Sequence, residues 1–184
     1  MNRHLVATNR PQSAIHLITL LVFLAINSAP AANLWVSPTN GLWRITNNWS
    51  LAKARDGTSG ADPTLITNAG TKTITIDSAT ALANLAPRFL AVSAPAGSTN
   101  TLALVDVSAG ALATSKPFLI GTRGALRITN PAVSPSDTFD ISNATVVLDS
   151  GSLSCPINLG LQAGSLTVNN GTLSTGPLST GIRM

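Results

Sequence analysis

A repeat of twenty residues constrains the fold of this chain more than any other feature of its sequence. When residues 121–180 are divided into three blocks of twenty, apolar and small residues recur at the same positions of each block. Agreement at so many positions indicates a structural repeat. The aligned apolar sets are Leu126, Val146 and Leu166; Ile128, Leu148 and Val168; Val133, Leu153 and Leu173; and Leu119, Phe139 and Leu159. Residues 101–120 fit with a shift of one residue, which places Val105, Val107, Gly110 and Leu112 at the positions of Val146, Leu148, Gly151 and Leu153.

The repeat predicts an all-β fold, a parallel β-helix (solenoid) in which each coil holds about twenty residues and three short strands. Strands are expected at 144–148, 152–154 and 158–161, separated by Gly, Pro, Asn and Asp, which tolerate the backbone angles of turns. Stacked coils would bury continuous ladders of the aligned aliphatic side chains. A β-sandwich of hairpins also has recurring strands. Hairpin lengths usually vary, however, so the constant spacing favours the β-helix.

The composition supports a β fold and excludes several chemistries. Only 10% of the residues are charged, and all seven acidic residues are Asp. The absence of Glu disfavours a helical bundle, whereas abundant Thr suits strands. Both histidines, His4 and His16, lie near the N-terminus, and Cys155 is the only cysteine. Without its N-terminal segment the chain has no residues for His-assisted catalysis, a His/Cys zinc site or an internal disulfide, and no cofactor is expected.

The N-terminus has the three regions of a secretory signal peptide. Arg3 and Arg10 lie in a basic start, an apolar run follows, and Ala29-Pro30-Ala31 matches an A-x-A cleavage site. Residues 1–31 are therefore predicted to be removed, and the chain to be secreted or displayed at the cell surface. The alternative is an uncleaved membrane anchor. The apolar run of about 12 residues is shorter than the roughly 20 that span a bilayer, so no transmembrane span is expected after cleavage.

Two regions are predicted after the signal peptide. Residues 32–70 form a tryptophan-rich cap and loop, and residues 71–184 form the β-helix domain. Within them, residues 71–77 alternate polar and apolar side chains, which predicts a strand. Residues 78–85 are expected to form a loop plus a strand rather than a short helix.

The tryptophans of the head allow two interpretations. Trp35, Trp43 and Trp49 lie within fifteen residues of one another, among turn-forming Asn, Gly and Pro. Aromatic faces suit carbohydrate binding, so the three are candidate sugar contacts. The alternative is a cap over the apolar ladder of the first coil, which would otherwise face water. Their position just before the first strand favours the cap.

Residues 118–128 and 159–168 resemble the L-x-I-G-x-x-G-x-L-x-[IV] coils of bacterial autotransporter-associated β-strand repeat proteins. Gly41-Leu42-Trp43 followed by Asn47-Asn48-Trp49-Ser50 resembles the G-x-W…N-W-S start common in that group. The resemblance covers most of residues 33–180. It implies a β-helical protein that is exported or displayed at the surface, although this chain is shorter than the large members of the group.

An enzyme must also be considered, because parallel β-helices include polysaccharide lyases and hydrolases. Such sites need two carboxylates, or acidic calcium ligands with a basic residue. The candidates are Asp137 and Asp140, combined with Asp149, Asp106 or Asp77 and with Arg123 or Arg127. Asp149 aligns with Thr129 and Asn169, so no stacked carboxylate array is expected, and the chain is predicted not to be an enzyme. Cys155 has no His or Lys near it in sequence, which favours a buried thiol over a nucleophile.

The sequence thus favours an exported, non-enzymatic, adhesin-like surface module whose long face presents Ser, Thr and Asn to cell-surface glycans. The alternative is a β-helix that binds or cleaves polysaccharide. Basic residues form no stripe, so nucleic acid is not an expected partner. No charge lies between Asp149 and Arg183, and the last full repeat has the pattern of an interior coil rather than of a polar cap. Self-association through residues 161–180 is therefore predicted, or a place in a longer repeat protein.

Overall fold

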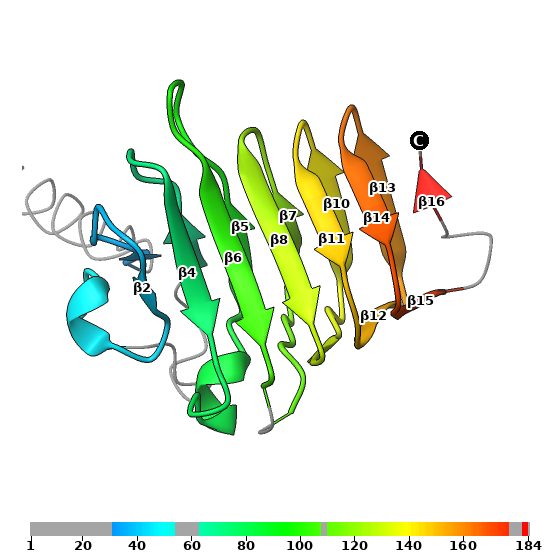
Figure 1. The fold of residues 1–184 in the computed structure, drawn as a ribbon, viewed down its shortest axis with the longest axis horizontal. Coiled ribbons are helices and arrows are strands. Elements are labelled where there is room, and N and C mark those ends of the chain that lie inside the picture. The colour runs from blue at the N-terminus through cyan, green and yellow to red at the C-terminus, as the bar shows by residue number, and fades with distance from the viewer. Residues whose placement is uncertain (1–30, 54–62, 108–109, 177–181, 184) are drawn as a thin grey trace, which may run out of the picture. The chain divides into compact units, whose positions relative to one another are not determined.

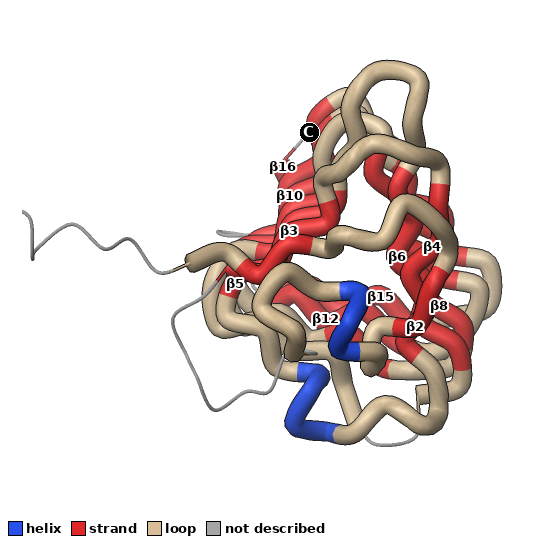
Figure 2. The backbone as a smooth tube through the Cα atoms, turned by 90° about the vertical axis from the view of Figure 1, so that its left-hand side faces the viewer, coloured by secondary structure: helices blue, strands red, loops and turns tan. Residues whose placement is uncertain are grey.

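The chain folds into a parallel β-solenoid, as the repeat predicts. The computed structural model describes residues 31–53, 63–107, 110–176 and 182–183, and these residues, apart from Ala31, belong to one compact unit, Ala32–Met184. Successive coils add strands side by side along the stack (Figure 1). Seen from the N-terminal side, the strands surround a common interior (Figure 2). The predicted signal peptide lies outside the described residues, except for Ala31.

Three parallel sheets make up the solenoid, and each strand pairs with strands of the neighbouring coils. Sheet 1 contains, in order, β1 (Asn33–Leu34), β3 (Pro63–Ile66), β5 (Phe89–Val92), β7 (Phe118–Ile120), β10 (Thr138–Ser142), β13 (Asn158–Gln162) and β16 (Ile182–Arg183). Sheet 2 contains β2 (Gly41–Leu42), β4 (Lys72–Ile76), β6 (Asn100–Val105), β8 (Gly124–Thr129), β11 (Thr145–Leu148) and β14 (Ser165–Val168). Sheet 3 contains β9 (Ala132–Val133), β12 (Ser152–Cys155) and β15 (Thr172–Thr175). Strands β11, β12 and β13 confirm the three strands predicted for one coil.

The predicted register of twenty holds through the last three coils. Leu148 pairs with Ile128 on one side and with Val168 on the other, and its side chain is fully buried. Two further predicted ladders are confirmed: Leu126, Val146 and Leu166, and Val133, Leu153 and Leu173. Burying each such side chain contributes roughly 1.5–3 kcal/mol, so the ladders are the core of these coils.

The predicted set of Leu119, Phe139 and Leu159 is wrong by one residue. Phe139 pairs with Phe118, and the two buried rings have centroids 4.9 Å apart. Leu119 instead pairs with Asp140 on the outer face of sheet 1. The cause is one extra residue in the corner between β7 and β8, compared with the corner between β10 and β11. That corner is closed by a 2.7 Å hydrogen bond from the Gly124 N–H to the Gly121 carbonyl.

The one-residue shift predicted for residues 101–120 is also wrong in part. Leu102 and Leu104 occupy the inward positions predicted for Val105 and Val107. Val105 faces outward and is 39% exposed. Leu112 keeps its predicted place in the third ladder. The connection that leads from β6 to Leu112 is longer than the one between β8 and β9, so no single shift aligns the whole block.

The tryptophan-rich head is the first coil of the solenoid. Its strands β1 and β2 pair in parallel with β3 and β4, so the sheets run through the boundary predicted at residue 71. The 3-10 helix η1 (Thr46–Asn48) follows β2. Strand β4 confirms the strand predicted at 71–77. The loop plus strand predicted at 78–85 is wrong, because a turn and the 3-10 helix η2 (Leu82–Leu85) occupy these positions.

The corners between sheets 1 and 2 differ between the N-terminal coils (β1–β6) and the C-terminal coils (β7–β15). In the N-terminal coils, long turns are held from inside by two buried polar side chains that pair in register, Lys72 and Asn100. The Lys72 Nζ donates to the carbonyls of Asn68, Ala69 and Gly70 at 3.0, 2.8 and 3.0 Å. The Asn100 Nδ2 donates to the carbonyls of Asn68 and Ser93 at 3.0 and 2.6 Å.

In the C-terminal coils the same corners are short. Arg123, Asn143 and Ala163 stack at intervals of twenty residues with φ angles of 59°, 50° and 49°, and each turns the chain in a left-handed conformation. Gly124 follows the first of them, and a Cβ atom at this position would lie 2.2 Å from the Val92 carbonyl oxygen. Direct contacts between the backbones of neighbouring coils therefore hold these turns, whereas side-chain hydrogen bonds hold the turns of the N-terminal coils.

Candidate functional site

The outer face of sheet 2 is a regular array of short side chains, most of them hydroxyl-bearing. Alternate residues of each strand point outward, and the parallel register aligns them in rows across the sheet. One row is Thr73, Thr101, Ala125, Thr145 and Ser165, and the next is Thr75, Ala103, Arg127, Val147 and Thr167. Positions repeat about every 4.8 Å across the strands and about every 6.6 Å along them. The face therefore offers polar groups at fixed intervals.

A hollow of about 550 Å³ lies in this array over β4, β6 and β8. Ala103 creates it, because its methyl group stands between the longer side chains of Thr75 and Arg127 in the same row. Ala103 and Val105 form the apolar part of the lining. The polar part consists of four hydroxyls and one guanidinium, from Thr73, Thr75, Thr101, Thr129 and Arg127.

A chain of polar contacts across three coils orients Arg127 at this hollow. Its Nε donates to Asp149 Oδ2 at 2.5 Å, and Asn169 Nδ2 donates to Asp149 Oδ1 at 2.9 Å. The hydrogen bonds from Asn169 and Arg127 hold the pKa of Asp149 below its ordinary value, so the carboxylate stays charged near neutral pH. The Arg127 side chain is 64% exposed, which keeps guanidinium N–H groups accessible to oxygen atoms of a ligand.

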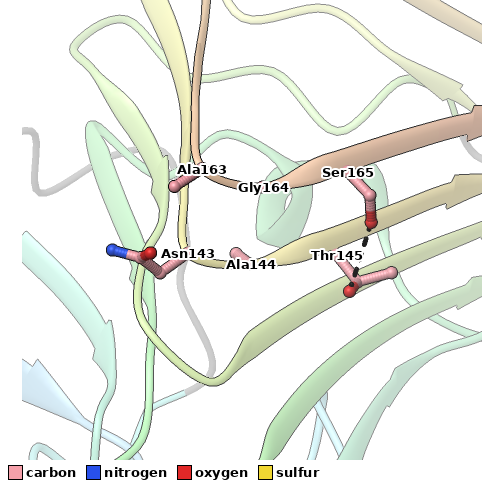
Figure 3. A pocket seen from close by; sticks show the side chains of 6 residues that line it. All are labelled: Asn143, Ala144, Thr145, Ala163, Gly164 and Ser165. Atoms are coloured by element: carbon pink, nitrogen blue, oxygen red, sulfur yellow. Dashed lines mark hydrogen bonds between the residues drawn. The ribbon is translucent and has the colours of Figure 1, made fainter.

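A second, shallower hollow of about 400 Å³ lies where β11 and β14 begin (Figure 3). The surface is hollowed at this corner because Ala144 and Ala163 have short side chains and Gly164 has none. The hydroxyls of Ser165 and Thr145 are 3.4 Å apart in neighbouring coils. This hollow continues the polar array toward the C-terminal coils without a charged lining residue.

The three tryptophans named as candidate sugar contacts are buried in the first coil. Trp35, Trp43 and Trp49 are 1%, 0% and 2% exposed, and the ring of Trp49 packs edge-on against the other two at centroid distances of 5.1 and 4.8 Å. The Trp43 Nε1 donates to the Asn84 carbonyl at 3.0 Å, and the Trp49 Nε1 donates to the Trp43 carbonyl at 2.7 Å. This packing is that of an end-closing core, as the cap interpretation requires, and it presents no indole face to a sugar.

Of the carboxylates considered for catalysis, Asp137 and Asp140 lie in one coil, just before and within β10, whereas Asp77, Asp106 and Asp149 lie in other coils at the ends of strands of sheet 2. Asp140 lies on the outer face of sheet 1, whereas Asp149 follows β11 of sheet 2. Asp137 accepts a hydrogen bond from the adjacent Thr138 N–H at 2.7 Å. Asp106 sits in a turn with a φ of 48° and accepts from a side-chain amide in the next coil at 3.2 Å. Among the described residues, no three His, Cys, Asp or Glu side chains come together in a group that could hold a metal ion.

Asp77 belongs to an ion pair at the end of β4. Its Oδ1 lies 3.2 Å from the Nε of Arg44 and accepts a hydrogen bond from the Thr80 hydroxyl at 3.0 Å. Burial raises the pKa of Asp77, but the hydrogen bonds from Arg44 and Thr80 outweigh it, so the net pKa is lowered. Like Asp149, this carboxylate is held in the charged state.

Cys155 is a buried thiol, as predicted. Its side chain points inward from β12 and is fully buried, and burial raises its pKa to about 12. A thiol with such a pKa stays protonated near neutral pH and is a poor nucleophile.

Comparison with family models, curated proteins and solved structures found no match for the chain. In the part of the chain that the structure describes, no helix has the length and hydrophobicity to cross a membrane.

Sequence analysis missed the hollow, although part of its signal was present. The alternation of β4 puts Lys72, Ile74 and Ile76 inside, which leaves Thr73 and Thr75 on the outer face. They lie beside β6 and Arg127 because paired residues in neighbouring N-terminal coils are more than twenty positions apart in the sequence. The repeat of the C-terminal coils does not contain that information.

Proposed function

We propose that the chain is an exported, non-enzymatic surface module that binds glycan chains across the outer face of sheet 2. The hollow over β4, β6 and β8 is the observation that carries this proposal. Its threonine hydroxyls can both donate and accept hydrogen bonds, which matches the hydroxyl groups of sugars. Arg127 adds a planar donor suited to the carboxylate or sulfate oxygens of an acidic sugar.

Weak contacts that repeat along a polymer suit a solenoid face. A hydrogen bond exchanged with water contributes only about 0.5–1.5 kcal/mol, so one sugar in the hollow would be held loosely. A polymeric glycan that lies along the rows can engage several hydroxyl positions at once, and linkage of the contacts raises the overall affinity. This favours an adhesin-like role over tight binding of a small molecule, in agreement with the resemblance to autotransporter-associated repeat proteins.

Binding can be tested by applying the protein to an array of neutral and acidic glycans and titrating each hit. Thr75→Val removes one hydroxyl from the hollow and keeps the shape of the side chain. It should weaken binding roughly 2- to 10-fold, the loss expected for one net hydrogen bond. Thr138→Val makes the same change on the outer face of sheet 1, away from the proposed binding face, and should leave the affinity unchanged. Equal affinities for both variants and the unaltered chain would reject the hollow as the binding site.

Export is supported by the order of basic, apolar and small residues at the N-terminus, and it has an independent test. The chain expressed in a bacterial host should be recovered outside the cytoplasm with Ala32 as its first residue. Mass analysis of the recovered protein measures this directly. A recovered chain that still begins with Met1 would contradict cleavage.

Polysaccharide cleavage is the alternative function. A glycosidase acid needs a raised pKa, whereas Asp77 and Asp149 have lowered pKa values and are paired with arginines. We therefore expect no release of reducing ends or unsaturated sugars when the protein is incubated with neutral and acidic polysaccharides. Turnover that Asp137→Ala or Asp140→Ala abolishes would overturn the non-enzymatic assignment.

A further inference from the structure

The C-terminal coil leaves part of the interior of the solenoid open. Its strands β14 and β15 are the last strands of sheets 2 and 3 and pair, among the described residues, on one side only. Leu161, Leu166 and Leu173 end their ladders only partly buried, and Val168 is 41% exposed. The equivalent residues one coil earlier, such as Leu148, are fully buried.

The backbone of β14 presents unpaired groups at the same edge. The N–H groups of Ser165 and Asn169 donate to the preceding coil, to the carbonyls of Ala144 and Leu148 at 2.9 Å each. Backbone groups of successive strand residues point to opposite sides. Leu166 and Val168 therefore direct their N–H and C=O groups away from β11. An open apolar edge of this kind is a template for another strand.

The opposite end of the solenoid is closed in a different way. The first coil is filled by Trp35, Trp43 and Trp49, and a bridge between Trp35 and Trp49 folds the chain back across it. The packed indoles occupy the interior that the leucine side chains of another coil would have to enter. The two ends are therefore not complementary, which argues against head-to-tail stacking.

The charge distribution permits two C-terminal coils to meet. No charged residue lies between Asp149 and Arg183, so most of this end is neutral. Two identical neutral edges approach without repulsion, whereas a charged partner would find no complementary group on the edge.

We infer that two copies of the chain associate through their C-terminal coils, with β14 of one copy pairing antiparallel with β14 of the other. A two-fold axis at Thr167 places Leu166 opposite the partner's Val168, and each such pair can exchange two N–H to C=O hydrogen bonds. The inward side chains of both strands then lie on the same face and cover each other's open ladder. Among the described residues, the short strand β16 pairs with β13 at Leu159 and Gly160 only, so few bonds are lost where the second copy displaces it.

Two variants with matched exposure test this inference. Val168→Lys places two like charges near each other across the two-fold axis, whereas Val105→Lys changes a valine of similar exposure, 39% against 41%, in the middle of sheet 2. Light scattering from low to high micromolar concentration should show a monomer–dimer equilibrium for the unaltered chain and for Val105→Lys. Val168→Lys should weaken it at least tenfold, with a circular dichroism spectrum like that of the unaltered monomer.

A cysteine at the axis provides a second readout. Thr167→Cys should form a disulfide-linked dimer under mild oxidation, while Thr145→Cys, also exposed and on the same face, should not. A strictly monomeric chain at high micromolar concentration would overturn the inference. So would a dimer that Val168→Lys does not weaken. Oligomers that grow beyond the dimer would show head-to-tail stacking and reject the two-fold arrangement.

Discussion

The N-terminal and C-terminal coils surround one continuous apolar core, but different chemistry holds their turns. In the N-terminal coils, the buried Lys72 and Asn100 side chains bond the carbonyls of long turns from within. In the C-terminal coils, Gly124 and small residues at the equivalent corners bring the backbones themselves into contact. The difference shows that coils of one solenoid can hold their turns in two ways. Regular coils use short turns whose backbones are in contact, whereas coils with longer turns use buried side chains that form hydrogen bonds with the additional carbonyls.

The two regions also end differently. Three tryptophans fill the first coil, while the last coil leaves leucines partly exposed. Apolar side chains of the first coil are therefore expected to contribute more to stability than those of the last coil.

Leu148→Asp should lower the free energy of unfolding by about 5 kcal/mol, because it buries a carboxylate without a partner in the middle of a ladder. Thr145→Asp lies on the same strand with an exposed side chain and should cost less than about 1 kcal/mol. Urea unfolding followed by circular dichroism measures both. Similar midpoints for the two variants would contradict the inward position of Leu148.

Trp43→Ala should cost about 3–5 kcal/mol, since it removes a fully buried indole from the first coil. Leu173→Ala in the last coil should cost about 1 kcal/mol, because its side chain is only partly buried there. The two unfolding curves should be compared at low concentration, where self-association is absent. A larger loss for Leu173→Ala would show that the last coil is closed in solution.

Lys72→Met tests the polar interior of the N-terminal coils. The substitution keeps much of the apolar stem but leaves the carbonyls of Ala69 and Gly70 without the Lys72 donor, while the Asn68 carbonyl keeps its bond from Asn100, so the expected cost is about 2 kcal/mol. Lys116→Met changes an exposed lysine and should have no effect on the unfolding midpoint. A Lys72→Met variant as stable as the unaltered chain would mean that the turn closes without this side chain.

Asp77 should make a small contribution to acid sensitivity. Its folded pKa is below the ordinary 3.8, so the charged form stabilises the fold above that pH, and this stability is lost as the pH falls through the folded value. The ion pair with Arg44 is partly exposed, so the effect should be less than about 1 kcal/mol. Asp77→Asn should remove this part of the pH dependence below 3.8 and leave the curve above that pH parallel to that of the unaltered chain.

The sequence predicted the fold class and the ladders of the C-terminal coils because constant spacing and inward alternation determine both. The Leu119 error came from one extra residue in a corner, which reverses the face of every residue in a short strand without changing its apolar character. The alternation of inward and outward side chains in β4 places Lys72 inside, whereas its charge predicts an exposed position. The sequence alone does not decide between these two signals. To predict the hollow, one must know which residues of β4, β6 and β8 lie side by side. The periodicity within one coil does not give this register.

The direction of the hydrogen bonds has a mechanical consequence. Every described strand pairs with strands of adjacent coils, so the ladder hydrogen bonds run along the stack while the strands lie across it. Tension applied along the stack would load the bonds of one coil at a time and peel the solenoid, rather than shear many bonds together. Among the described residues, β14 and β15 have no neighbouring strand at their outer edges, so peeling should begin there, and the tryptophan-filled coil should be the last to open. In a force-extension experiment, the C-terminal coils should therefore appear as small, nearly equal steps, each releasing about twenty residues.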